Sequence, residues 1–291
     1  MMHRPENNIA AFGEADEGAI ACPWRASLTL AWREILGFSR QGSRVVGAIG
    51  QPLVFWIFFS AGFDRNFRLD GTMEGQSASF AEYYFPGTLV LILLFTAIFS
   101  TISLIEDRRE GFLQSVLVAP LPRWSMVLGK VLGGAVLAVI QGGLFLMLAW
   151  TLPIEFSFWK LVQIAVLMLL ASLGLTSLGF AIAWRMESTQ GFHAIMTVFL
   201  MPLWLLSGAF FPVPSLAADS TWLQIGLYGI MQANPLTYTV AGMHQLLYDG
   251  PLSSALDLPT MATCWLVTVI AAVLMFVAAC WTASGFSRSV P

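Results

Sequence analysis

Six long apolar stretches constrain this chain more than any other feature of its sequence. A helix needs roughly 20 apolar residues to cross the hydrocarbon core of a bilayer. The stretches are continuous, whereas the strands of a membrane barrel alternate apolar and polar residues. The sequence therefore predicts an all-α integral membrane protein with six transmembrane helices, at Arg44–Phe63, Tyr84–Ile105, Val131–Thr151, Leu161–Trp184, Phe192–Phe211 and Met261–Gly285.

The composition agrees with a lipid environment. The chain has 291 residues, of which 57% are hydrophobic and 11% charged, and its mean hydropathy is +0.74, whereas a soluble domain carries about 25% charged residues. No basic patch with interleaved aromatic residues is present, so nucleic-acid binding is not expected. The three cysteines, Cys22, Cys264 and Cys280, lack metal-binding spacing, so no metal site is expected either.

The charges predict an orientation. Acidic residues near the start occupy the place of a signal-peptide apolar region, so we expect the N-terminus to stay in the cytoplasm. The inner side then holds 11 of the 14 basic residues, and the outer side only Arg65, Arg68 and Lys160. We expect a multi-pass protein of the inner (cytoplasmic) membrane with both termini in the cytoplasm. We expect residues 1–23 to form a disordered cytoplasmic tail, residues 24–285 the transmembrane domain and residues 286–291 a second cytoplasmic tail.

The segment from Trp24 to Arg40 mixes apolar and basic residues ahead of the first span. Its apolar residues recur at helical spacing, with Leu28, Ala31 and Ile35 on one side. This pattern predicts an N-terminal helix at residues 24–40 that lies in the cytoplasmic interface. The alternative is that the segment extends the first span into the cytoplasm.

The connection from Pro212 to Thr260 is the longest between the spans and has no Lys or Arg. Its apolar piece, Trp222–Met231, is too short to cross the membrane. The pair Asn234-Pro235 is predicted to break a helix. We therefore expect a short re-entrant or interfacial hairpin on the outer side between spans five and six. A seventh span is the alternative, and it would place Arg288 outside.

The connection between spans two and three, residues 106–124, begins with five consecutive charged residues, Glu106-Asp107-Arg108-Arg109-Glu110. An Asp or Arg at the centre of a bilayer costs about 2.5–3.5 kcal/mol, so this pentad is expected in water or at the interface. Four apolar residues that follow share one helical face: Phe112, Leu113, Val116 and Leu117. Pro120 and Pro122 end that helix. The result is a short amphipathic helix, which is either a plain connector or a docking element.

The chain resembles the permeases of ABC-2 type transporters in three motifs. In that family the loop after the second span has a charged cluster, Gly-Thr-Leu-Glu, an apolar pair, Pro and a Gly-Lys that enters the third span. This chain has Arg108-Arg109-Glu110, Gly111-Phe112-Leu113-Gln114, Val116-Leu117, Pro120 and Gly129-Lys130, with Phe112 and Gln114 as departures. Leu206–Pro212 and Ala233–Tyr238 resemble two further family motifs, around the end of span five and after the outer hairpin. The resemblance extends from Trp24 to Gly285.

The resemblance implies the membrane-spanning permease subunit of an ATP-driven ABC exporter. Its substrate would be amphipathic, drug-like, lipid-linked or a polysaccharide, moved out of the cytoplasm or the inner leaflet. Two copies of a separate ATPase chain would carry ATP and Mg, so no cofactor or catalytic residue is expected on this chain. The permease would form a homodimer, or a heterodimer with a related permease. No G-x-x-x-x-G-K-[ST] motif occurs, and Lys130 is expected to extend to the membrane interface.

By the same resemblance, the short helix between spans two and three is the coupling helix that docks on the ATPase. Phe112 and Leu113 are the expected inserted contacts, and the helix at residues 24–40 is a second contact. The ATPase-coupling residues implied by the resemblance are Glu106, Asp107, Arg108, Arg109, Glu110, Gly111, Phe112, Leu113, Val116 and Leu117.

Three glutamines and two pairs of small residues lie within or near the predicted spans. Gln51, Gln141 and Gln163 are candidates to line a pathway, although an interhelical hydrogen bond is the commoner role of a glutamine. Gly129 with Gly133, and Ser177 with Ala181, have the small-xxx-small spacing that permits close helix packing.

Two other functions are less well supported by the sequence. An ion-coupled secondary transporter usually needs an ionisable residue deep in a span, and no predicted span has Asp or Glu at its centre. A membrane-embedded enzyme needs clustered His, Asp or Glu, whereas His3, His193 and His244 are scattered. The sequence does not name the transported substrate.

Overall fold

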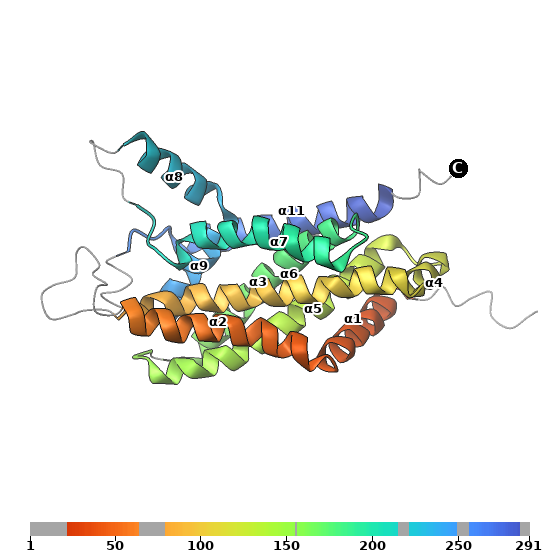
Figure 1. The fold of residues 1–291 in the computed structure, drawn as a ribbon, viewed down its shortest axis with the longest axis horizontal. Helices are drawn as coiled ribbons and strands as arrows, with labels where there is room; N and C mark the ends of the chain where they lie inside the picture. Colours follow the sequence, from red (N-terminus) through yellow and green to blue (C-terminus); the bar gives the residue numbers. More distant parts are fainter. Residues whose placement is uncertain (1–21, 64–78, 155, 215–220, 249–255, 286–291) are drawn as a thin grey trace, which may run out of the picture.

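A computed structural model describes residues 22–63, 79–154, 156–214, 221–248 and 256–285. These residues form a helical bundle without a strand, and six helices are long and apolar enough to cross a membrane (Figure 1). The predicted all-α fold with six spans is therefore confirmed. The six helices are α2 (Gly42–Phe63), α3 (Phe80–Arg109), α5 (Arg123–Leu146) with the turn η2 (Met147–Thr151), α6 (Phe158–Ala183), α7 (Thr189–Trp204) with the turn η3 (Leu205–Ala209), and α11 (Met261–Gly285).

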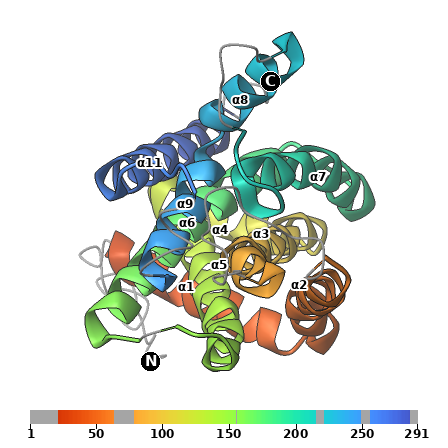
Figure 2. The same ribbon diagram turned by 90° about the vertical axis from the view of Figure 1, so that its left-hand side faces the viewer.

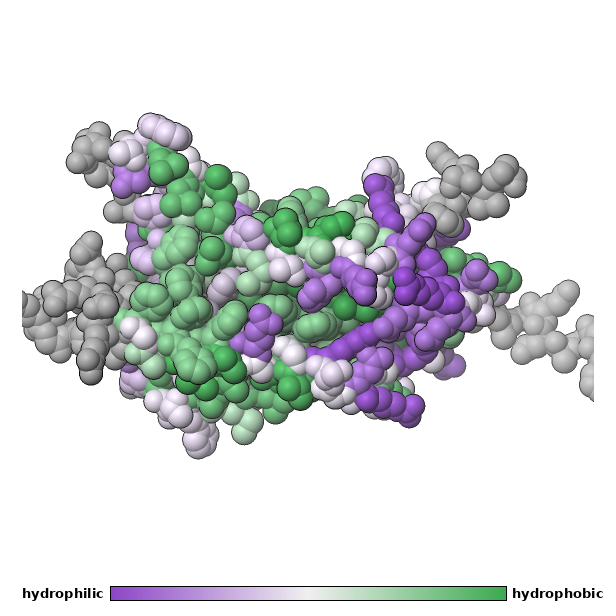
Figure 3. All heavy atoms as spheres, viewed as in Figure 1, coloured by the Kyte–Doolittle hydropathy of each residue, from purple (hydrophilic) through white to green (hydrophobic). Residues whose placement is uncertain are grey.

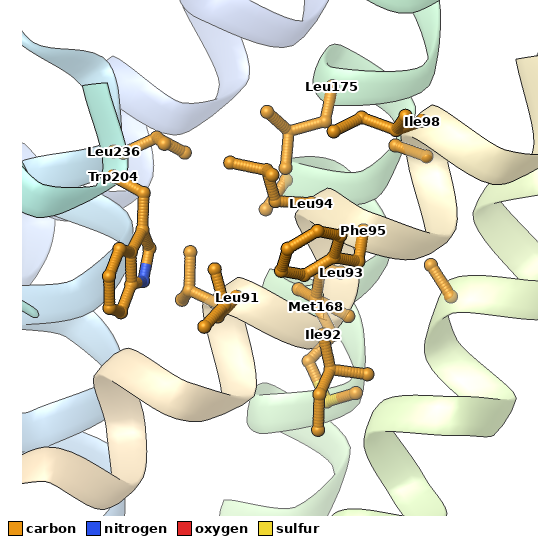
Figure 4. Packing of buried hydrophobic residues seen from close by; sticks show 14 of the residues in the cluster. Leu91, Ile92, Leu93, Leu94, Phe95, Ile98, Met168, Leu175, Trp204 and Leu236 are labelled. Carbon is orange, nitrogen blue, oxygen red and sulfur yellow. The ribbon is translucent and has the colours of Figure 1, made fainter. Parts of the chain in front are cut away.

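Helix α3 forms the centre of the bundle, with α2, α5, α6 and α7 around it (Figure 2). Every residue from Tyr83 to Ile98 is buried, because a helix that is apolar on all sides is stable only when other elements surround it. In Figure 4, Leu91–Phe95 and Ile98 of α3 lie among Met168 and Leu175 of α6, Trp204 of α7 and Leu236 of α9 (Pro235–Leu247).

The irregular end of the fifth span is fixed against α3. The turn η3 contains Gly208 at φ +77°, a conformation that favours glycine. The carbonyl oxygen of Gly208 accepts a hydrogen bond of 2.6 Å from the Tyr83 hydroxyl. The Trp204 indole donates to the carbonyl oxygen of Gly87 at 2.8 Å. A Cβ atom at Gly87 would lie 2.4 Å from the carbonyl oxygen of Ala209, so a glycine permits this close approach.

The shorter helices lie at opposite ends of the bundle (Figure 1). One end carries α1 (Pro23–Ser39) and α4 (Phe112–Val118), and we call it the α4 end. Helix α8 (Trp222–Ala233) projects at the other end, which we call the α8 end. On the face shown in Figure 3, hydrophilic residues gather at the α4 end, while most of the remaining surface is apolar. This distribution is expected of a chain whose middle is surrounded by lipid.

The segments predicted outside the spans form separate helices. α1 ends at Ser39 and α2 begins at Gly42, so α1 is not an extension of the first span. α8 and α9 are divided at Asn234, whose side chain accepts a hydrogen bond from the backbone N–H of Leu236. The depth of these helices in the membrane stays a prediction. The predicted tails, residues 1–23 and 286–291, lie almost wholly outside the described residues.

Two of the spans are longer than predicted at the α4 end. α3 continues to Arg109, so four residues of the charged pentad are helical. α5 begins at Arg123, well before the predicted start at Val131, because Pro122 is its N-cap and the helix passes through Lys130. A lysine within a span is tolerated here because two carboxylates neutralise its charge.

Candidate functional site

The predicted coupling loop is a helix end, a tight turn and a short helix. After the last residue of α3, Arg109, the chain turns at Gly111, where φ is +80°. A residue with a Cβ is strained in this left-handed region, whereas glycine is not. Helix α4 follows at Phe112–Val118, and Pro120 and Pro122 separate it from α5, as predicted.

Four charged side chains from three helices meet behind α4, and we call them the buried charge cluster: Arg33 and Glu34 of α1, Asp107 of α3 and Lys130 of α5. Lys130 Nζ donates hydrogen bonds to the carboxylates of both Glu34 and Asp107. The Arg33 guanidinium donates to both oxygens of Asp107, at 3.0 and 2.7 Å. The cluster holds two positive and two negative charges, so its members neutralise one another.

Three of the four members are closed off from solvent, while the Arg33 side chain is 41% exposed. The side chains of Lys130, Glu34 and Asp107 are only 5%, 6% and 5% exposed. Burial of a charge is costly unless it is paired and hydrogen-bonded, and Ser103 provides a further bond by donating to Glu34 at 2.5 Å. The hydrogen bond to Asp107 raises the pKa of Arg33 above its ordinary value, so this guanidinium stays charged.

Phe112 covers the cluster on the side of α4. The guanidinium carbon of Arg33 lies 3.7 Å from the centre of the Phe112 ring, a cation–π geometry. The first residue of α4 is thus in direct contact with a charge that binds Asp107. A displacement of α4 would act on the cluster through this contact.

Three further residues of the pentad bind α2 or the segment between α6 and α7. Glu106 accepts a hydrogen bond from Arg44 of α2. Arg108 donates to the carbonyl oxygen of Trp184 at 2.5 Å, just after α6. Arg109 donates to the carbonyl oxygen of Glu187 at 2.8 Å, in the turn between α6 and α7. The end of α3 therefore joins α1, α2, α5 and the α6–α7 turn, while Glu110 is exposed.

Helix α4 divides its apolar residues between the bundle and the surface. Leu113 is 3% exposed and packs in the core, and Phe112 and Val116 are half-buried. Leu117 and Val118 are 37% and 87% exposed. In this conformation Leu113 contacts the helical bundle itself. The apolar surface that α4 offers to a partner is therefore formed by Leu117 and Val118.

Close packing of α1 on α5 brings Arg33 and Glu34 of α1 into the cluster. A Cβ atom at Gly129 would lie 2.7 Å from Leu30 Cβ, and one at Gly133 would lie 2.7 Å from Glu34 Cβ. Helix α1 therefore packs directly against the predicted small-residue pair on α5. The expectation that Lys130 extends to the interface is wrong, because α1 covers this lysine and supplies Glu34 as its partner.

The structure does not bring the three candidate glutamines together. Gln51 of α2 and Gln163 of α6 are exposed. Gln141 of α5 is buried, and its Oε1 atom accepts a hydrogen bond of 2.7 Å from the Thr96 hydroxyl of α3. Gln141 therefore has the interhelical role that is usual for a glutamine in a span.

Sequence reasoning missed Arg33 and Glu34 as members of the site. Glu34 is the only acidic residue between Trp24 and Arg40, and this was the signal that could have found it. A single carboxylate in a basic amphipathic segment indicates a specific cation partner. The sequence alone does not show that the partner, Lys130, lies almost 100 positions further along the chain.

Together, the fold and the site define a polytopic helical membrane protein with a short helix and a charge cluster at one end. The sequence model of the ABC-2 type transporter family matches residues 25–248. The chain belongs to the ABC-2 type transporter family, and it is a transport permease. Permeases of this family typically pair with an ATPase subunit.

Several curated proteins are similar to the chain. A putative transport permease, ycf38, from Cyanophora paradoxa is 29% identical over 214 residues, which cover 72% of this chain and 70% of the relative. The daunorubicin resistance ABC transporter permease protein DrrB1 from Streptomyces coeruleorubidus is 21% identical over 77% of this chain and 75% of its own length. The probable multidrug ABC transporter permease YbhR from Escherichia coli K12 is 30% identical over 44% of this chain and 34% of its own length.

Proposed function

We propose that this permease is the membrane-spanning part of an ATP-driven exporter in the inner membrane, with both termini in the cytoplasm. ATP and Mg would be bound by a separate ATPase, of which two copies act with a pair of permeases. The observation that carries the proposal is the position of α4. It lies at the charged end of the bundle, exposes Leu117 and Val118, and contacts the buried charge cluster through Phe112.

The proposed mechanism transmits movement of the ATPase through α4. Leu117 and Val118 would enter an apolar groove on the ATPase, while the charged residues from Glu106 to Glu110 hold the end of α3. When ATP closes the ATPase pair, α4 would move and displace Arg33 through Phe112. Because Arg33 binds Asp107, and Lys130 joins Asp107 to Glu34, α1, α3 and α5 would move together.

Helix α1 would be the second ATPase contact and would lie in the membrane interface. One of its faces is buried, and Ser27, Leu30, Ala31 and Glu34 on this face pack on α5. Four large apolar residues are exposed at intervals of four positions on another face: Trp24, Leu28, Trp32 and Leu36. An apolar stripe on a helix that also carries arginines is typical of an interfacial helix.

The cargo would be an amphipathic, drug-like molecule. Two similar proteins are named as permeases for multiple drugs and for daunorubicin resistance. The second permease of the complex would be another copy of this chain or a related one. Large apolar side chains exposed on α2, including Val46, Ile57 and Phe58, would be covered by lipid or by that second permease.

Co-purification of the permease with its ATPase tests the proposal. The ATPase in this test is a phosphate-binding-loop protein from the same genome, expressed with a tag. Leu117→Asp combined with Val118→Asp should abolish co-purification, because two carboxylates would have to enter an apolar groove. Leu113 is unsuitable for this test, since an Asp there would disturb the core of the permease.

The matched control is Ser284→Asp, which adds a charge at an exposed position of α11 at the same end of the bundle. This variant should co-purify like the unmodified permease. Equal co-purification of the α4 double variant would contradict the assignment of α4. Export by purified components that continues without ATP, and stops when an ion gradient is removed, would contradict ATP-driven transport.

A further inference from the structure

A cavity lies near the α8 end, away from the buried charge cluster. Its volume is about 400 Å³, and α9, the start of α3, the turn η3 and the segment before α11 contribute to its walls. Val213, Leu256 and Leu258 provide apolar walls, while Tyr83, His244 and Asp257 are among its polar residues. A cavity with apolar walls and few polar groups is the usual form of a small-molecule site.

His244 is a buried polar group that the proposed transport mechanism does not use. Its side chain is 2% exposed, and neither ring nitrogen has a hydrogen-bond partner among the described residues. The imidazole packs beside the rings of Tyr83 and Tyr248, at centroid distances of 5.4 and 6.3 Å. Buried polar side chains are almost always hydrogen-bonded, so His244 is available to a molecule that enters the cavity.

The chemistry of His244 specifies the group that would bind it. Burial lowers the pKa of His244 to about 3, so the imidazole is neutral. A neutral imidazole offers one N–H donor and one acceptor nitrogen. A hydroxyl, amide or sulfonamide can satisfy such a side chain, whereas a carboxylate or phosphate would leave its acceptor nitrogen unpaired.

The charge of the cavity favours a cation. Among the lining residues that the structure describes, Asp257 is the only charged one, and none is a lysine or arginine. The Asp257 side chain is exposed, so it stands where a ligand would enter. A cleft with one sign of charge attracts ligands of the opposite sign.

We propose that this cavity binds an amphipathic organic cation. Its ammonium group would pair with Asp257, its apolar body would lie between Val213, Leu256 and Leu258, and an uncharged polar group would bind His244. The assignment concerns the permease alone. It does not depend on ATP-driven export, and its test requires neither the ATPase nor transport.

Three fluorescent probes with the same apolar body and different charges test this assignment. Dansylcadaverine carries an ammonium group, dansylamide is uncharged and dansylglycine carries a carboxylate. Binding to the purified full-length permease in lipid nanodiscs is measured by fluorescence, with empty nanodiscs subtracted. Dansylcadaverine should bind most tightly and dansylglycine most weakly. Asp257→Asn should lower the affinity for dansylcadaverine about fivefold and leave the affinity for dansylamide unchanged.

Two variants of His244 and one matched control complete the experiment. His244→Leu removes the hydrogen-bonding atoms and should weaken both dansylcadaverine and dansylamide, whereas His244→Gln keeps a donor and an acceptor and should retain most of the affinity. Glu187→Gln removes an exposed carboxylate at the α4 end and should leave the affinity for all three probes unchanged. Equal affinities for the three probes would overturn the assignment, and so would an unchanged affinity for dansylcadaverine in Asp257→Asn. Both of these results can be measured even if His244→Leu does not fold.

Discussion

At the scale of single residues, the balance of charge around Lys130 decides how the α4 end is built. This lysine is paired with Glu34 and Asp107, and all three side chains are at most 6% exposed. A buried pair adds little net stability compared with an apolar alternative, but removal of one partner leaves the other charge buried without compensation. The main role of the cluster is therefore to specify which helices pack together, and its net contribution to the stability of the fold is small.

Lys130→Met tests this role of the cluster. The substitution should lower the free energy of unfolding by about 3–5 kcal/mol, because two buried carboxylates would share only Arg33. Adding Glu34→Gln should restore most of the loss, since Arg33 and Asp107 would remain as a neutral pair. The measurement is unfolding of the purified permease in detergent, followed by circular dichroism.

The control for this prediction is Arg25→Met, which removes an exposed cation of α1. It should change the stability by no more than about 0.5 kcal/mol. A loss of similar size in the control, or no recovery in the double variant, would show that the charges of the cluster are not coupled.

At the scale of elements, the packing of α1 on α5 depends on two glycines, Gly129 and Gly133. Gly133→Ala would bring its Cβ within 2.9 Å of the Ala31 carbonyl oxygen and closer still to Glu34 Cβ. We expect α1 to shift outward and the permease to lose about 1–3 kcal/mol, the usual cost of overpacking. The matched control is Gly143→Ala in the same helix, where a Cβ would meet no atom within 4 Å.

The position of α1 can be measured by a disulfide. The hydroxyl oxygens of Ser27 and Ser125 are 2.9 Å apart, so a cysteine pair at these positions should cross-link readily. Gly133→Ala should reduce the cross-linked fraction and Gly143→Ala should not. A cross-linked fraction that both substitutions leave unchanged would show that α1 does not depend on this close approach.

The elements show which parts of the structure the sequence could predict. Six apolar runs and the breaks at Pro120, Pro122 and Asn234 predicted the helices, because periodicity and proline act locally. The burial of Leu113, the pairing of Lys130 with Glu34 and the cavity beside His244 depend on contacts between segments far apart in the chain. A single sequence does not contain that information.

At the scale of the whole molecule, the two ends have different chemistry. The α4 end carries paired charges and the exposed residues Leu117 and Val118. The α8 end carries a cavity in which Asp257 is the one charged side chain among the described lining residues. In the orientation that we propose, the α4 end faces the cytoplasm and meets the ATPase, and the α8 end faces the opposite side and meets small molecules.

Labelling of α4 from each side of the membrane tests this orientation most directly. In a variant whose Cys22, Cys264 and Cys280 are replaced by serine, Val118→Cys on α4 and Trp222→Cys on α8 are exposed to a membrane-impermeant thiol reagent. Val118→Cys should react in inside-out vesicles and stay unlabelled in intact cells, while Trp222→Cys should show the reverse pattern. Labelling of Val118→Cys in intact cells would place α4 on the outer side, where it could not meet an ATPase.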